Sequence, residues 1–289
     1  MVKLRVDMHA HSDMTGEPYM RRNTPRRVIQ GAFDRGLDVL NISDYRLDGF
    51  LDSIASNPEK NLPPGTAFWG GTQNDGYLHV RGPKGENLLL LRGMEWPNSD
   101  GSEHVLSVGH RTPIKHDPDA KISIPERAKI IKDHGGLVGA AHGFNVAYGG
   151  MGYNKLLEYA DILDFFEVGN PLNTRNQMLD RLVRKLAIGQ DMPGLVNSDS
   201  HDPHHIGMAH TVLDVDFDGS DPWSAPEKMR ERVLQAVLTG DREFVLDYIS
   251  QFSMGKIFIG QRILYGALER DGVEIKRGFD LIMDALKGK

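Results

Sequence analysis

The stretch Val6-Asp7-Met8-His9-Ala10-His11-Ser12 continues a predicted strand that begins at Lys3. Side chains alternate along an extended chain, so Asp7, His9 and His11 are expected to point to the same side. Two imidazoles on one face supply half of a metal site. A His-x-His pair also arises by chance, and its partners must therefore come from the rest of the chain.

The composition limits which partners are possible. The chain has 289 residues, which suffices for one large α/β barrel or two modest domains. It has no cysteine, and this excludes thiolate zinc sites, cysteine nucleophiles and disulfides. Any metal must be held by His, Asp and Glu, and the 12 histidines are the feature to follow.

The charge and hydropathy patterns bear on partners and location. The net charge is −6, with 34 basic and 40 acidic residues and no long basic stripe, which argues against a protein that coats nucleic acid. No window approaches the roughly 18 apolar residues of a membrane span, and the first residues offer no apolar signal region. A soluble, cytoplasmic protein that does not bind membranes is expected, and nothing indicates its oligomeric state.

Predicted strands and helices alternate along most of the chain, which favours a mainly parallel sheet. Polar residues recur where strands end, and this favours a barrel over an open sheet because a barrel brings those ends together. Residues 57–87 are rich in Pro, Gly and Asn and are read as an insertion, with a hairpin around 76–83. Residues 256–289 are expected to form a helical extension of a single domain that spans 1–289.

Several predicted strands carry a metal-competent side chain at one end. These residues are His9 and His11, Glu95, His104, His142, and Asp199 with His201. Asp199 and His201 repeat the spacing of the opening pair. So many such groups on separate elements are not expected of solvated loops or core histidines, so together they predict a metal site.

In order and spacing, these motifs resemble those of the PHP (polymerase and histidinol phosphatase) family. The resemblance spans about residues 3 to 215 and rests on Asp7-x-His9-x-His11, Ser43-Asp44, Gly93-x-Glu95, His104-Val105-Leu106, Ala141-His142 and Asp199-Ser200-His201. It implies a distorted (β/α)7 TIM-like barrel with two or three divalent metals at its C-terminal mouth. It also implies hydrolysis of phosphate monoesters or diesters.

The resemblance also implies a set of ligands. One metal would be held by His9, His11, Glu95 and Asp199, and a second by Glu95 as a bridge with His104 and His142. Asp7 would support the ligands rather than bind metal. Histidine and carboxylate ligands suit Zn, Mn or Fe, and the sequence does not choose among them.

The sequence departs from the family pattern at a third metal site. The Thr-Asp-His motif of the family is replaced here by Ser43-Asp44-Tyr45, and Asp13 stands nearest to the place of a further missing histidine. The third site is therefore either absent or rebuilt from Asp13, Asp44 and His201.

Other side chains are candidates for roles beside the metals. His201 and Asp44 are the candidate catalytic residues, with His201 acting as a general acid or orienting the phosphate. Tyr45, Arg46 and Arg111 are candidate substrate contacts.

The leading hypothesis is a metal-dependent phosphoesterase that uses a metal-bridging hydroxide. Its expected substrate is a small-molecule phosphate ester or a short nucleotide, without an extended nucleic-acid surface. A carbamate, amide or carboxylic-ester hydrolase on the same barrel is one alternative. A non-catalytic metal-binding or regulatory domain is an alternative of a different class.

Overall fold

The computed structural model describes residues 1–15, 20–45, 48–115, 120–171, 177–217, 219 and 221–246. These residues belong to one compact unit, Met1–Asp247. The helical extension predicted at 256–289 and the candidate contact Arg46 lie outside the described residues. Within the described part, no helix is both long and apolar enough to cross a membrane. The cytoplasmic location stays a prediction.

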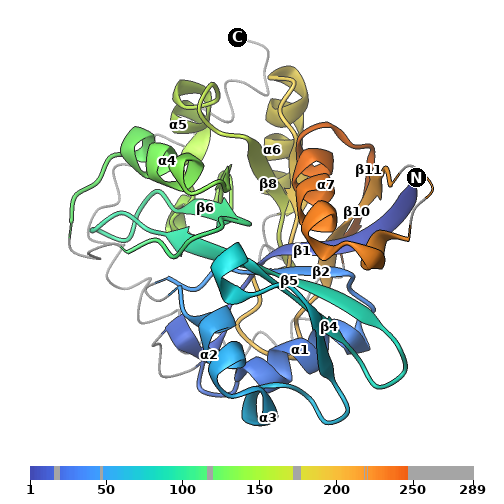
Figure 1. The fold of residues 1–289 in the computed structure, drawn as a ribbon. Coiled ribbons are helices and arrows are strands. Elements are labelled where there is room, and N and C mark those ends of the chain that lie inside the picture. Colours follow the sequence, from blue (N-terminus) through green and yellow to red (C-terminus); the bar gives the residue numbers. More distant parts are fainter. Residues whose placement is uncertain are drawn as a thin grey trace. The chain divides into compact units, whose positions relative to one another are not determined.

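Seven neighbouring strands of a larger mixed sheet form an α/β barrel, with helices around it (Figure 1). In spatial order they are β1 (Val2–Ala10), β2 (Val39–Ile42), β5 (Asn87–Trp96), β6 (Val105–Val108), β7 (Leu137–Ala140), β8 (Phe165–Gly169) and β9 (Gly194–Val196). A bridge between Ala10 and Ser200 brings the chain after β9 against β1, so the sheet nearly closes. This confirms the predicted barrel.

Four further strands extend the sheet. β10 (Ala209–Val215) pairs antiparallel with β1, and β11 (Arg242–Leu246) pairs with β10. The insertion predicted at 57–87 holds β3 (Ala67–Gly70) and β4 (Tyr77–Arg81), and β4 pairs with both β3 and β5. The hairpin in this region is therefore an addition to the barrel sheet.

Strand β6 runs antiparallel to both of its neighbours, β5 and β7. A parallel neighbour needs a crossover of a dozen or more residues, and the connection between β5 and β6 is too short for one. As a result, the beginning of β6 lies at the same end of the barrel as the end of β5. His104, immediately before β6, is thereby placed beside Glu95 of β5.

Helices pack outside the strands (Figure 1). They are α1 (Pro25–Asp34), α2 (Phe50–Ser56), α3 (Pro58–Asn61), α4 (Ile124–Asp133), α5 (Gly152–Glu158), α6 (Gln177–Gly189) and α7 (Pro226–Thr239). α1 buries Val28, Ile29 and Ala32 on one face, as the apolar spacing predicts. Three clusters of buried aliphatic and aromatic side chains fill the space inside the barrel and beneath the helices.

A buried amide joins three strands inside the barrel. Nδ2 of Asn41 in β2 donates to the carbonyl oxygen of Met8 in β1 at 3.1 Å. Its Oδ1 accepts from the backbone N–H of Gly109, directly after β6, at 3.1 Å. Gly93 leaves room for this amide, because a Cβ there would lie 2.1 Å from Asn41 Nδ2. The position of Glu95, two residues farther along β5, therefore depends on a glycine at 93.

Gly93→Ala is expected to lower the free energy of unfolding by about 1–3 kcal/mol, because the added methyl group overlaps the Asn41 amide. Asn41→Ala should also destabilise the chain, since it leaves buried backbone groups without partners. The double variant should lose less than the sum of the two losses, because the overlapping amide is gone. Urea unfolding measures all three, and strict additivity would contradict the proposed overlap.

Candidate metal centre

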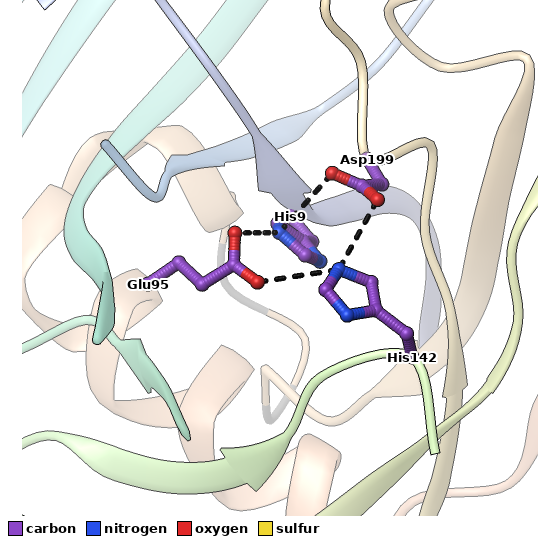
Figure 2. Close-up of side chains that lie close together, drawn as sticks. All are labelled: His9, Glu95, His142 and Asp199. Atoms are coloured by element: carbon purple, nitrogen blue, oxygen red, sulfur yellow. Dashed lines mark hydrogen bonds and ion pairs between the residues drawn. The ribbon is translucent and has the colours of Figure 1, made fainter. Parts of the chain in front are cut away.

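Four buried side chains converge at one end of the barrel. Figure 2 shows His9 from β1, Glu95 from β5, His142 after β7 and Asp199 after β9 with their polar atoms directed at one another. His11, two residues after His9, is also fully buried and joins them. These elements are distant in sequence, and the closed sheet brings them together.

One group of atoms, here called the first ligand set, surrounds a single point. It consists of Nε2 of His9, Nε2 of His11, Oε2 of Glu95 and Oδ1 of Asp199. The separations that the structure gives between pairs of these atoms are 3.1 to 3.4 Å. Two ligands about 2.1 Å from a shared cation, at tetrahedral to right angles, lie about 3.0–3.4 Å apart. The first ligand set therefore has the spacing of metal ligands.

The remaining carboxylate oxygens, Oε1 of Glu95 and Oδ2 of Asp199, form a second ligand set with Nδ1 of His104 and Nε2 of His142. Oε1 of Glu95 lies 2.6 Å from Nδ1 of His104 and 3.2 Å from Nε2 of His142. The same His142 nitrogen lies 3.2 Å from Oδ2 of Asp199. Both Glu95 and Asp199 thus divide their oxygens between the two sets, whereas the sequence analysis assigned a bridging role to Glu95 alone.

The charges of the cluster are compatible with bound cations. Burial alone would raise the pKa of Glu95, but the imidazoles of His9, His104 and His142 hold it well below its ordinary value. Burial opposes ionisation of Asp199 too, and His9 and His142 lower its pKa in the same way. Two ionised carboxylates among imidazole nitrogens form a donor set suited to divalent metals.

The imidazoles are oriented by hydrogen bonds on their far sides. Nδ1 of His9 donates to Oε1 of Glu167 at 3.1 Å, which leaves Nε2 of His9 as the ligand atom. Nε2 of His104 donates to the carbonyl oxygen of Gly101 at 3.0 Å, which leaves Nδ1 facing Glu95. Glu167 also accepts from the backbone N–H of His142 at 2.7 Å.

Glu167 and Asn197 are functional residues that the sequence motifs did not identify. The Asn197 amide donates to Glu167 Oε1 at 3.1 Å, and its Oδ1 accepts from the backbone N–H of Met8 at 2.9 Å. A polar residue directly after the apolar strand residues Leu195 and Val196 was the available signal.

Asp7 is directed at the backbone rather than at the ligand sets. Its carboxylate accepts from the backbone N–H groups of Ser198 and Gly207, both at 3.0 Å. Burial raises its pKa to about 6 despite these hydrogen bonds. Asp7 thus fixes the segment that carries Asp199, a placement compatible with the supporting role expected for it.

Two ligand candidates have strained backbones. His142 has φ 48° and Asp199 has φ 45°, in the left-handed region that side-chain-bearing residues rarely occupy. Such a conformation costs roughly 1–2 kcal/mol per residue and persists only when the surroundings impose it. In this conformation both side chains, each just after the end of a strand, are directed at the other ligand candidates (Figure 2).

A smaller cluster lies beside the first ligand set, where the sequence analysis placed a doubtful third metal. His201 approaches His11 and Asp199 closely enough for the three to hold a cation. Tyr45 stacks on the ring of His11, with centroids 4.6 Å apart, and its hydroxyl lies 3.4 Å from Nε2 of His201. The His11 and His201 rings are themselves 4.6 Å apart, so Tyr45 lies on a different side of His11 from His201.

The structure does not bring Asp13 and Asp44 into the ligand sets. Both oxygens of Asp44 accept from Ser12, at 2.7 Å from its backbone N–H and 2.5 Å from its hydroxyl. Burial raises the pKa of Asp44 to about 6. Asp13 begins a short 3-10 helix, Asp13–Thr15, and its pKa is also raised by burial. Asp44 holds the chain immediately after His11.

The predicted substrate contact at Arg111 does not fit its position. Arg111 follows β6, whose antiparallel direction carries the chain to the barrel end away from Glu95. There its guanidinium pairs with Glu231 at 3.0 Å and Glu227 at 3.7 Å, both on α7. A substrate contact at Arg111 would require this loop to lie at the same end of the barrel as Glu95, and it does not.

Comparisons with known proteins bear on the fold. No family model and no curated protein matches the sequence. Among solved structures, endonuclease Q in complex with a 27-mer duplex substrate is similar with 17% identity and a TM-score of 0.55, covering 84% of this chain. This chain spans 58% of the length of that endonuclease Q chain.

Two further structures share the fold. PsfC from Pseudomonas syringae PB-5123 is 14% identical with a TM-score of 0.60, covering 92% of this chain and 100% of its own. A two-domain protein containing a predicted PHP-like metal-dependent phosphoesterase from Bacteroides vulgatus is 13% identical with a TM-score of 0.52. It covers 82% of this chain and 61% of its own. The described barrel therefore has the fold of PHP-like proteins, as the motifs predicted.

One expectation about partners is wrong. The sequence predicted a small-molecule ester or short nucleotide as substrate and no extended nucleic-acid surface. The endonuclease Q complex holds a 27-mer duplex with an abasic lesion at the active site. A protein that contains a barrel of this fold thus holds an extended nucleic acid, and the expectation of no extended nucleic-acid surface is not supported.

Glu167→Gln is expected to weaken binding of Mn or Zn by about 10- to 100-fold, because a neutral amide supports His9 less well. Titration of the metal-free protein by calorimetry measures this loss. Glu59→Gln, an exposed change of the same charge on α3, serves as the control. Equal affinities for the two variants would contradict a supporting role for Glu167.

Proposed function

We propose that this chain, which has the fold of the PHP-like proteins, is a metal-dependent phosphoesterase. The observation that carries the proposal is that Glu95 and Asp199 are shared between two sets of imidazole and carboxylate atoms at metal-ligand spacing. The fold shared with a predicted PHP-like phosphoesterase and with an endonuclease supports phosphate ester hydrolysis over other reactions.

Two divalent cations, Zn, Mn or Fe, would be held by the two ligand sets. One would take His9 and His11, the other His104 and His142, with Glu95 and Asp199 common to both. When bound, such cations supply Lewis-acid activation of water near neutral pH and neutralise phosphoryl oxygens. A third cation beside His201 is not needed for this proposal.

The remaining residues position these groups and border the site. Glu167 and the Gly101 carbonyl fix the tautomers of His9 and His104. Nδ1 of His201 donates to the carbonyl oxygen of Asp199 at 2.9 Å, so its Nε2 acts as an acceptor beside the Tyr45 hydroxyl. Tyr45 and His201 are the side chains that we propose contact the substrate.

Nucleic acid is the substrate class that we propose for this site. The endonuclease Q complex supports this choice, because its duplex places an abasic lesion at the active site of a similar barrel. A phosphodiester would present to the ligand sets the charged, non-bridging oxygens that divalent cations neutralise.

Glu95→Gln is expected to reduce kcat/KM for a phosphate ester by about 1,000-fold or more, equivalent to about 4 kcal/mol, because it removes charge from both ligand sets. The assay compares p-nitrophenyl phosphate, bis(p-nitrophenyl) phosphate and p-nitrophenyl acetate, with Mn, Zn or Fe added singly. Glu59→Gln is the matched control.

Three outcomes would contradict the proposal. Phosphate ester turnover that survives Glu95→Gln would exclude the ligand sets as its source. Turnover of the acetate ester alone would favour a carboxylic-ester hydrolase. Bound metal without turnover of any ester, including a labelled DNA duplex, would favour a non-catalytic domain.

His201→Asn is expected to lower kcat by about 10- to 100-fold, because the imidazole at the edge of the site is lost. The metal content, measured by mass spectrometry, should stay at that of the unaltered chain. A loss of one metal per chain would contradict a substrate contact and place His201 among the ligands.

A further inference from the structure

A groove runs along the outer side of α1, between this helix and residues 202–204 of the loop that follows the ligand Asp199. It encloses about 740 Å³. We call it the arginine groove, because Arg22, Arg27 and Arg35 line it together with His204. None of these residues belongs to the ligand sets.

The sequence of α1 explains why these side chains share a face. Arg27, Gly31 and Arg35 recur at every fourth position and form one stripe of the helix, whereas Val28, Ile29 and Ala32 are buried on the other side. A Cβ at Gly31 would lie 2.4 Å from the carbonyl oxygen of Pro203. The helix and the loop therefore touch at Gly31, which forms the floor of the groove.

The groove holds cationic groups that the fold does not use. Within the described part of the chain, Arg22, Arg27 and Arg35 form no ion pair, and all three are exposed. Its two carboxylates already have partners. Asp34 accepts from the amide of Gln30 at 2.9 Å, and Asp202 accepts from the backbone N–H of His204 at 2.9 Å.

Both walls of the groove are attached to the metal centre. Asp202 follows His201 directly, and its carbonyl oxygen accepts from the hydroxyl of Ser200 at 2.6 Å. On the other wall, Arg22 precedes Asn23, whose amide donates to the carbonyl oxygen of His11 at 3.1 Å. His204 is five residues beyond Asp199, so the two lie at most about 18 Å apart.

We propose that the arginine groove binds the phosphodiester backbone of a nucleic acid strand on one side of the phosphate held at the metal centre. The proposal rests on the proposed function, and it identifies where this chain would hold an extended substrate. Guanidinium groups bind phosphate through paired hydrogen bonds. Contacts to phosphates position a nucleic acid without reading its sequence.

The spacing of the arginines suits a polymer of phosphates. Arg27 and Arg35 are eight residues apart, which is about 12 Å along a helix. A nucleic acid strand rises about 3.4 Å per nucleotide, so this length covers three to four steps. The limit of about 18 Å to the ligands corresponds to roughly five nucleotides.

The test measures binding of a fluorescein-labelled 20-nucleotide strand, single and as a duplex, by fluorescence anisotropy with a chelator present. Arg27→Ala and Arg35→Ala should each raise Kd by about 3- to 10-fold and reduce the salt dependence by about one phosphate contact. Arg21→Ala removes the same charge next to Arg22 but outside the groove, and it should change Kd less than twofold. Circular dichroism confirms that each variant is folded.

Three results would overturn the inference. The first is a loss of DNA affinity for Arg21→Ala as large as for Arg27→Ala. The second is competition by polyglutamate equal to that of unlabelled DNA at the same charge concentration. The third is no DNA binding at protein concentrations up to 100-fold above the expected micromolar range. Failure of the proposed function is separate, because it appears as absent hydrolysis of bis(p-nitrophenyl) phosphate by the unaltered chain. If DNA binding depends on Arg27 and Arg35 but no ester is hydrolysed, the arginine groove is supported as a binding site and the phosphoesterase activity is excluded.

Discussion

The structure depends on two buried carboxylates that are each shared between two groups of imidazoles. An isolated carboxylate inside a protein loses its hydration and becomes neutral. Glu95 and Asp199 remain ionised because imidazoles from β1, from the start of β6 and from the end of β7 lie beside them. These groups come from strands far apart in sequence and can meet only if the sheet nearly closes. The attraction between the carboxylates and the imidazoles therefore favours the closed sheet.

Several features away from the centre maintain this geometry. Asn41 joins three strands inside the barrel, and Asp7 holds the backbone that carries Asp199. The left-handed conformations of His142 and Asp199 cost energy that surrounding contacts must offset. Glu167 supports a histidine of each ligand set, because it accepts hydrogen bonds from the ring of His9 and from the backbone N–H of His142. The ligand atoms are thus held by packing and hydrogen bonds around them.

The sequence predicted the barrel and the residues that converge, because strand periodicity and side-chain chemistry are local properties. His9 and His11 share a face since they are two residues apart, and Glu95 and His142 stand where apolar strands end. The site of Arg111 was not predictable from periodicity, since it depends on the direction of β6. The role of Asp44 depends on its contact with Ser12, which no spacing rule gives. The arginine groove was missed because its two walls, residues 22–35 and residues 202–204, are separated by more than 160 positions in the chain.

The antiparallel turn from β5 into β6 has a consequence for the order in which the centre assembles. It places His104 only nine residues from Glu95, whereas His11 and Asp199 are 188 residues apart. Loop-closure entropy makes the distant contact costlier by about 3 kcal/mol. Closing the short connection between Glu95 and His104 therefore costs less chain entropy than bringing His11 to Asp199. The contact between His11 and Asp199 requires the first and last strands of the barrel to meet, so the first ligand set is complete only when the barrel has closed.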